Sequence, residues 1–123
     1  MEITSTLASS STSLTREDGR VVCEHLLVAA RPLRRMRGLL GRSGLAEGEG
    51  ILLRPAGSIH TFFMRFAIDA VFLDRDLVVV GIEPSLAPWR TAGRRGAKSV
   101  VELASGECAR RGIEVGDVLT VAA

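Results

Sequence analysis

The chain has few of the side chains that usually carry chemistry. It has no Tyr, one Trp, two His and two Cys among 123 residues. The cysteines, Cys23 and Cys108, lie far apart and form no CxxC pair, the spacing typical of structural zinc sites and dithiol redox centres. A disulfide would require the fold to bring them together, so we expect reduced thiols. The sequence therefore predicts neither a bound metal nor a cofactor.

Long hydrophobic runs are also missing. No apolar segment approaches the roughly 20 residues that a membrane helix needs. Residues 1–18 have neither a basic start nor the continuous apolar segment used for export. We therefore expect a cytoplasmic protein with no membrane partner. Hydrophobic residues make up 46% of the chain and charged residues 24%, which suits an ordinary core in one compact domain.

A large excess of charge of one sign is absent as well. The formal net charge is +2, and all of the 16 basic residues except Lys98 are Arg. Such a small net charge, with no recognition motif, makes nucleic acid an unlikely partner. Basic residues do gather at 31–42 and 90–98, so a nucleic-acid contact through a basic face stays a lesser alternative.

The most aromatic stretch of the sequence is residues 58–74, SIHTFFMRFAIDAVFLD. It contains all four Phe residues, and His60, Arg65 and Asp69 are set within its apolar run. A run this apolar should be buried on both faces, so polar residues within it need partners or a purpose. We expect a strand over 59–64, a bend at 65–67 and a second strand over 69–73. The predicted core residues are Phe62, Phe63, Phe66, Ile68, Val71 and Phe72.

The remaining pattern predicts an α+β fold, a small mainly-β single domain built as a barrel or a strongly curved mixed sheet. Two short helices are expected near 31–41 and 104–111, the second capped by Ser105. Residues 1–14 form a polar N-terminal tail or an edge strand, and 15–123 the globular domain. Further strands are expected at 20–28, 51–53, 77–82, 99–103 and 118–121, with an irregular segment at 83–90.

Three polar side chains of the central stretch form the core of a candidate ligand site. His60 can exchange protons near neutral pH, Arg65 can bind a carboxylate or phosphate with two hydrogen bonds, and Asp69 can orient either. In the competing, structural interpretation Asp69 pairs with Arg65 or with loop amides, and His60 is a satisfied, half-buried residue. Apolar walls with few polar groups are typical of small-ligand sites. The other candidate ligand-binding residues are Thr61, Met64, Trp89 and Arg90.

Two other patterns are weaker. A zinc site can be imagined from Cys23, His25, His60 and Cys108, but spacing supports only the first pair, on one strand face. Residues 93–99, GRRGAKS, superficially resemble a phosphate-binding loop. Their spacing does not fit GxxxxGK[ST], and they precede a strand instead of opening a helix. We expect neither pattern to define the function.

Five motifs in order resemble a known family. They are RGLLGR at 37–42, the central stretch, PWR at 88–90, VVELASGECARRGIEVGD at 100–117 and a closing strand. In this order they resemble the uncharacterised bacterial and archaeal family called domain of unknown function 192, over about residues 20–121. The resemblance implies a compact β-rich domain with an N-terminal helix, and it transfers no activity.

The chain departs from that family's pattern at two places. It has Ala56 where members often have Cys, which argues against an indispensable thiol nucleophile there. It has Asp76-Leu77 where members commonly have Gly, which affects only the turn.

Two functions of different classes fit these residues. We expect a non-catalytic module that binds a small anion-bearing ligand or a partner's peptide segment, because no nucleophile and base stand at a recognisable spacing. The alternative is a small enzyme with His60 as general acid or base and Asp69 orienting it. In that enzyme Arg65 or Arg90 would stabilise developing negative charge.

Overall fold

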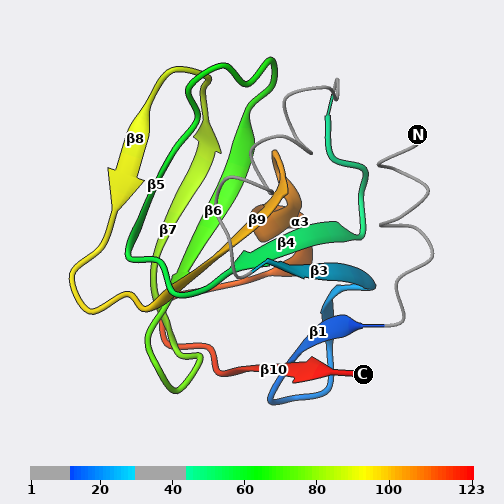
Figure 1. The fold of residues 1–123 in the computed structure, drawn as a ribbon. Helices are drawn as coiled ribbons and strands as arrows, with labels where there is room; N and C mark the ends of the chain where they lie inside the picture. The colour runs from blue at the N-terminus through cyan, green and yellow to red at the C-terminus, as the bar shows by residue number, and fades with distance from the viewer. Residues whose placement is uncertain (1–11, 30–43) are drawn as a thin grey trace.

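The computed structural model describes residues 12–29 and 44–123 (Figure 1). Within them lie ten strands and one helix, each set off by turns that are rich in Gly, Asp or Arg. The elements are β1 (Ser13–Arg16), β2 (Val21–Cys23), β3 (His25–Ala29), β4 (Glu49–Leu53), β5 (Ser58–His60), β6 (Ile68–Leu73), β7 (Val79–Leu86), β8 (Thr91–Gly93), β9 (Ser99–Ala104), α3 (Glu107–Arg111) and β10 (Leu119–Ala122).

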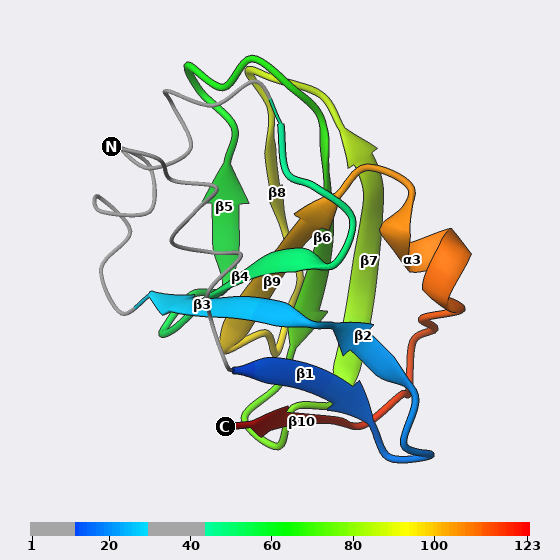
Figure 2. The same ribbon diagram turned by 90° about the vertical axis from the view of Figure 1, so that its right-hand side faces the viewer.

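The strands form three sheets. The central sheet has five strands in the order β3-β4-β9-β6-β7, in which β3 and β4 run parallel and the other neighbours antiparallel. A second sheet, β10-β1-β2, joins the two ends of the described chain, and β5 pairs with β8 in a two-stranded sheet. Figure 2 shows the β10-β1-β2 sheet at one end of the central sheet and the β5-β8 pair alongside it.

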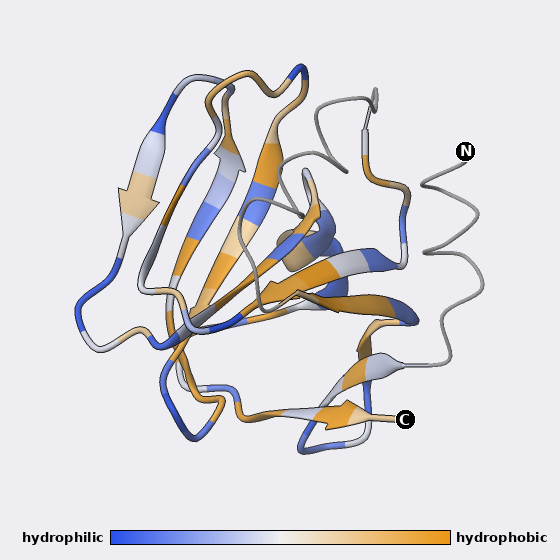
Figure 3. Cartoon of the chain, viewed as in Figure 1, coloured by the Kyte–Doolittle hydropathy of each residue, from blue (hydrophilic) through white to orange (hydrophobic). Residues whose placement is uncertain are grey.

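Both faces of the central sheet are buried, which explains the near-continuous apolar runs of its inner strands. Every residue of β4 and β6 is buried, and so are all residues of β9 except Ala104. Figure 3 shows these strands as mostly hydrophobic and the connecting turns as hydrophilic. On one face Leu52, Val71 and Val101 pack with residues of the β10-β1-β2 sheet and α3. On the other face Phe72 and Val100 belong to a second buried cluster, which also includes Ile59 of β5.

The predicted mainly-β domain is confirmed, but the predicted barrel is not observed in the described part of the chain. The described residues form three sheets and one short helix, and they show no closed barrel. The expected helix at 104–111 is present but shorter, Glu107–Arg111, and it follows Gly106 in a left-handed conformation without a side-chain cap from Ser105. The expected helix at 31–41 lies outside the described residues. Of the expected N-terminal tail, Ser13 and Leu14 already belong to β1.

Several expected boundaries were wrong for local reasons. The strand expected at 20–28 is two strands, because a bend at Glu24 shifts the alternation. The strand expected at 59–64 ends at His60, because the chain turns at residues 62 and 63. β7 continues through Pro84, which an edge strand tolerates because the missing N–H is not needed there.

The described chain contains no long apolar helix. None of its helices in residues 12–29 and 44–123 meets the length and hydrophobicity needed to cross a membrane.

Candidate functional site

Two loops at one end of the molecule carry most of the candidate residues. Residues 61–67 connect β5 to β6, and residues 87–90 connect β7 to β8 (Figure 1). The two loops continue the β5-β8 pairing, since the Thr61 N–H donates a 2.8 Å hydrogen bond to the Arg90 carbonyl oxygen. The Trp89 N–H in turn donates to the Thr61 carbonyl oxygen at 3.0 Å. The loops are therefore held side by side by backbone contacts.

The side chain of Thr61 adds a second set of bonds between these loops. It is fully buried. Its hydroxyl lies 2.6 Å from the Ala87 carbonyl oxygen, to which it donates, and it accepts a 2.9 Å bond from the Arg90 N–H. The structure thus places Thr61 beneath the surface as a connector, where the sequence had suggested a ligand contact.

Four rings, one from His60 at the end of β5 and three from the two loops, form a chain of contacts on the surface. His60 stacks on Phe62 with centroids 4.7 Å apart, and Phe62 stacks on Trp89 at 5.8 Å. Phe63 contacts Trp89 at 4.6 Å with its plane tilted by 59°. Phe62, Phe63 and Trp89 are 36%, 63% and 55% exposed. We call these four residues the aromatic platform.

Two platform residues hold a strained backbone. Phe63 has φ = 67° and Trp89 has φ = 64°, in the left-handed region that bulky side chains rarely adopt. Each such residue costs roughly 1–2 kcal/mol relative to an ordinary conformation. Gly would adopt either conformation without strain. The fold therefore carries aromatic side chains at two positions where its backbone alone would favour glycine.

Two arginines flank the platform in sequence. Arg65 follows Phe63 by two residues and Arg90 follows Trp89 directly, and both are exposed. Arg90 donates a 3.3 Å hydrogen bond from Nη1 to the Trp89 carbonyl oxygen. In the part of the chain that the structure describes, neither guanidinium has a carboxylate within ion-pair distance. Both positive charges remain available to an anion.

Asp69 is occupied by the fold itself. It is 1% exposed, and its two oxygens accept hydrogen bonds from the Ser85 N–H at 2.8 Å and the Cys108 N–H at 2.9 Å. Among residues 12–29 and 44–123, no hydrogen bond or ion pair joins it to His60 or Arg65. Asp69 was expected to pair with Arg65 or with loop amides; its partners are instead backbone amides of the strand β7 and the helix α3. Its role is to tie β6 to β7 and to the first turn of α3.

The remaining candidates divide between surface and core. His60 is half-buried, and its Nδ1 accepts a 3.3 Å hydrogen bond from the Phe62 N–H. Met64 is buried and packs in the cluster that contains Ile59 and Ile68. The structure therefore brings together His60, Trp89 and Arg90, and it separates Met64 and Asp69 from that exposed surface.

Sequence reasoning missed Phe62 and Phe63 as surface residues. Both were predicted to be core, whereas Ile68, Val71 and Phe72 are indeed buried and Phe66 is partly buried against the core. The available signal was the Thr61-Phe62-Phe63-Met64 segment, which places two large rings next to each other instead of at alternating positions. A turn at residues 62 and 63 allows both adjacent rings to lie on the surface, which a regular strand with alternating faces does not.

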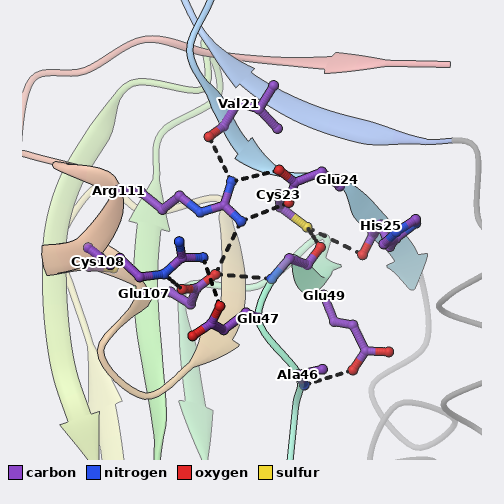
Figure 4. Close-up of polar contacts among 12 residues, drawn as sticks. Val21, Cys23, Glu24, His25, Ala46, Glu47, Glu49, Glu107, Cys108 and Arg111 are labelled. Carbon is purple, nitrogen blue, oxygen red and sulfur yellow. Dashed lines mark hydrogen bonds and ion pairs between the residues drawn. The ribbon is translucent and has the colours of Figure 1, made fainter.

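A second polar cluster lies where α3 meets β2 and the turn before β4 (Figure 4). Arg111 donates to both carboxylate oxygens of Glu24, at 3.0 and 2.7 Å, and to the Val21 carbonyl oxygen at 3.0 Å. Glu107 accepts from the Gly48 N–H at 3.1 Å and from Arg110 Nε at 2.6 Å. These contacts join three segments that are distant in sequence.

Both cysteines are buried free thiols. Burial raises the pKa of Cys23 to about 12, and the thiol contacts the carbonyl oxygens of His25 and Gly48, each at 3.3 Å. Burial, followed by the negative charge of Asp69, also raises the pKa of Cys108. Within the described residues, no cluster of three or more His, Cys, Asp or Glu side chains is arranged to hold a metal ion. Neither thiol is poised to act as a nucleophile.

The basic loop at 93–99 packs against the central sheet through Arg94. Its Nη2 donates to the Ile82 carbonyl oxygen at 3.1 Å and pairs with Glu83 at 3.3 Å. Its guanidinium carbon lies 5.2 Å from the centre of the Phe72 ring. This arginine is therefore engaged within the protein, while Arg95 is exposed.

Fold and site together define a small mainly-β domain with an exposed aromatic platform and two exposed arginines near it in sequence. Residues 13–121 match the family described as uncharacterised ACR, domain of unknown function 192, and the chain belongs to this family. The resemblance noted from its motifs is confirmed. A UPF0127 protein of Thermococcus sibiricus is 30% identical over 109 residues, covering 85% of this chain and 70% of that protein.

One further relative gives the same assignment, and two solved structures share the fold. The UPF0127 protein PF1050 of Pyrococcus furiosus is 43% identical over 67 residues, which cover 54% of this chain and 57% of that protein. A solved structure of a protein of unknown function from Novosphingobium aromaticivorans matches with a TM-score of 0.74 and 23% identity, over 89% of this chain and 82% of that one. A chain from Sinorhizobium meliloti, provisionally described as a transcription regulator, has the same score and identity over 89% and 91%. At this identity the likeness shows the fold alone.

Proposed function

We propose that this protein is a non-catalytic binding module that recognises an anion-bearing small ligand or partner segment on its aromatic platform. The observation that supports this proposal is the group of four rings in successive contact, three of them substantially exposed, at the end of β5 and on the two loops. Contiguous exposed apolar side chains on a small domain mark interaction surfaces. The backbone strain at Phe63 and Trp89 is consistent with a surface whose side chains serve a purpose beyond folding.

The arrangement of the rings favours a negatively charged ligand. His60, Phe62 and Trp89 stack with 27° between successive planes, so each ring covers part of its neighbour's face. Aromatic faces carry negative partial charge and edges positive partial charge. A cationic ligand needs uncovered faces directed at one point. Stacked rings offer edges, which attract carboxylates and phosphates.

The flanking arginines point to the same ligand chemistry. Arg65 and Arg90 are exposed and have no carboxylate partner among the described residues. A guanidinium binds a carboxylate or phosphate through two parallel hydrogen bonds. A ligand with an apolar or planar body and an anionic group would therefore contact both parts of the surface.

The contacts of Asp69 favour binding over catalysis. An enzyme built on His60 would need a carboxylate to orient the ring, and Asp69 was the expected partner. Asp69 is buried and its oxygens accept from the backbone amides of Ser85 and Cys108, and among the described residues no hydrogen bond joins it to His60. The proposal therefore gives no catalytic role to this pair.

The single Trp provides a direct test. Trp89 is the only Trp and there is no Tyr, so fluorescence excited at the indole band reports on the platform alone. We expect phenylacetate and phenyl phosphate to change this fluorescence, and uncharged phenylacetamide to bind roughly three- to tenfold more weakly. Arg65→Ala and Arg90→Ala retain Trp89 and should remove the preference for the anion.

The matched control is Val115→Ala, which truncates another exposed apolar residue in the turn between α3 and β10. Calorimetric titration extends the test to Trp89→Ala and His60→Ala. The proposal would be contradicted if wild type bound phenylacetate and phenylacetamide equally well. It would also be contradicted if Phe62→Ala and Trp89→Ala bound phenylacetate as tightly as wild type does.

A further inference from the structure

The two-stranded β5-β8 sheet has an open hydrogen-bonding edge beside the aromatic platform. The register pairs Ser58 with Gly93, Ile59 with Ala92 and His60 with Thr91. One step beyond each end of this ladder, the Arg94 N–H donates to the Gly57 carbonyl oxygen and the Thr61 N–H to the Arg90 carbonyl oxygen. Hydrogen-bonded pairs alternate along antiparallel strands. Ile59 and Ala92 are therefore the bonded pair between them.

This alternation fixes which backbone groups face away from the partner strand. On β8 they are the N–H and C=O groups of Thr91 and Gly93, both exposed residues. Arg94 Nη1 occupies one of them, the Gly93 carbonyl oxygen, at 2.9 Å. Across residues 12–29 and 44–123, β8 has no strand neighbour other than β5. The Thr91 N–H, the Thr91 C=O and the Gly93 N–H thus form an outward-facing edge.

We propose that this edge accepts an extended acidic peptide segment of a partner protein as a third strand. The inference rests on the proposed function, and it specifies the partner class of the same site. Unsatisfied N–H and C=O groups two residues apart match the repeat of an extended chain, the mode known as strand addition. Because Arg90 and Trp89 immediately precede β8, a strand added along Thr91 continues onto the platform.

Charge at both ends of β8 selects the occupant. Arg90 lies at one end and the exposed Arg95 lies beyond the other, while Arg94 is already paired with Glu83. In an antiparallel pairing of two β8 strands, Arg90 of one copy would approach the end that carries Arg95 in the other, and like charges brought together destabilise a sheet. A second copy is therefore disfavoured at this edge. An acidic segment gains from the same charges.

The test uses a pool of short synthetic peptides in which Glu alternates with apolar residues, and the same peptides N-methylated at alternate positions. N-methylation keeps the side chains and removes the strand's hydrogen-bond donors. We expect the unmodified peptides to bind, and the N-methylated forms to bind roughly tenfold more weakly. Amide hydrogen exchange should slow at Thr91 and Gly93 when the unmodified peptides bind.

A pair of variants isolates the edge. Thr91→Pro removes one outward N–H without breaking a bond to β5, a substitution that edge strands tolerate. It should weaken peptide binding roughly tenfold. Thr91→Val keeps the backbone donor and should bind as wild type does. The N-methylated peptides test the same bond on the unaltered chain, so a folding defect in Thr91→Pro would not obscure the answer.

The outcomes separate this inference from the proposed function. Equal binding of methylated and unmodified peptides, or peptide binding with unchanged exchange at Thr91 and Gly93, overturns strand addition even if Trp89 responds. Failure of every peptide in the pool to bind overturns it as well. In each case the phenylacetate titration judges the platform independently.

Discussion

At the scale of single residues, the hydroxyl group of Thr61 links the two loops of the aromatic platform. It donates to Ala87 and accepts from Arg90, at 2.6 and 2.9 Å. Because Thr61 is fully buried, water cannot replace either bond if the hydroxyl is removed. The order of the platform thus depends on a side chain that a ligand would not touch.

We predict that Thr61→Val lowers the free energy of unfolding by about 1–3 kcal/mol. The valine keeps the shape and leaves the Ala87 carbonyl oxygen and the Arg90 N–H without that partner. Urea denaturation measures the change, and Trp89 fluorescence reports any loosening of the loop. Thr61→Ser keeps the hydroxyl and should lose less than about 1 kcal/mol, the value of one buried methyl group. A valine variant as stable as wild type would show that these two bonds contribute nothing.

The sequence identified much of the platform but misjudged its packing. His60, Trp89 and Arg90 were among the residues of one candidate ligand site, and these three do lie together, at the end of β5 and on the loop after β7. Phe62 and Phe63 were assigned to the core, since their hydrophobicity was given more weight than their adjacent positions. The turn that exposes them depends on a positive φ at Phe63, which residue type argues against.

At the scale of elements, the helix α3 depends on a residue from another strand. Its N-cap, Gly106, has no side chain to accept from the first turn. Asp69 of β6 supplies the acceptor, since one of its oxygens lies 2.9 Å from the Cys108 N–H. A carboxylate at this end also suits the helix dipole. The expected cap, Ser105, instead lies 2.7 Å from the hydroxyl of Ser85.

Replacing Asp69 by Asn should therefore loosen α3. An amide offers one acceptor oxygen, so either the Ser85 or the Cys108 N–H faces an NH2 group, at a cost of about 1–3 kcal/mol. Two measurements apply, urea denaturation and the rate at which a thiol reagent modifies buried Cys108, which should rise. The control Ser105→Ala removes an exposed contact and should change stability by less than about 0.5 kcal/mol. Unchanged Cys108 reactivity in Asp69→Asn would refute the capping role.

The ion-pair cluster of α3, formed by Glu107, Arg110 and Arg111 with Glu24, predicts an acid dependence of stability. Burial on its own would raise the pKa of Glu107, but hydrogen bonds from Arg110 and the Gly48 N–H, with the charge of Arg111, outweigh burial and lower it. The hydrogen bond from Arg111 likewise lowers the pKa of Glu24. Both carboxylates thus bind protons less readily in the folded state than in the unfolded state.

A group of this kind contributes stability above its unfolded pKa, about 4.3 for Glu, and loses it as the pH falls through the lower folded value. We predict that the free energy of unfolding falls below about pH 4.3 and that Glu107→Gln makes this decline shallower. The variant should also be less stable at neutral pH. Denaturation at a series of pH values tests both statements, and identical slopes for the two proteins would exclude Glu107 as a contributor.

At the scale of the whole molecule, Arg94 connects the β5-β8 sheet to the central sheet. It follows β8 in sequence, bonds to Ile82 and Glu83 of β7, and lies over Phe72 of β6. Gly81 makes room for it, since a Cβ there would come within 2.5 Å of Arg94 atoms. One long side chain thus spans from the platform's sheet to the core.

We predict that Arg94→Met lowers stability by about 1–2 kcal/mol, because it loses the cation–π contact and the hydrogen bonds and keeps most of the apolar stem. Gly81→Ala should have a similar effect by displacing the same side chain. Thermal unfolding measures both. Arg95→Met, at the exposed neighbour, should stay within about 0.5 kcal/mol of wild type. If Arg95→Met matched Arg94→Met, the effect would reflect loop charge instead of the contacts of Arg94.

Fold class and family were predictable at this scale, but sheet order was not. Short apolar runs separated by turns indicated a mainly-β domain, and the order of five motifs indicated the family. The residue types of β3 and β4, such as Leu26 and Leu52, do not indicate that these strands run parallel. The sequence of β9 likewise does not indicate that it lies between β4 and β6. Pairing between strands distant in sequence depends on the shape of the completed core, which local patterns do not contain.

The position of β9 also determines when the protein can fold during its synthesis. In the central sheet the strand pairs β3-β4 and β6-β7 are joined through β9, residues 99–104. Until Ala104 has left the ribosome, the strand pairs β3-β4 and β6-β7 exist as separate two-stranded pieces with exposed edges, which are marginal in water. Nascent chains stalled before Ser99 should therefore need protection from aggregation, and chains released after β9 should not.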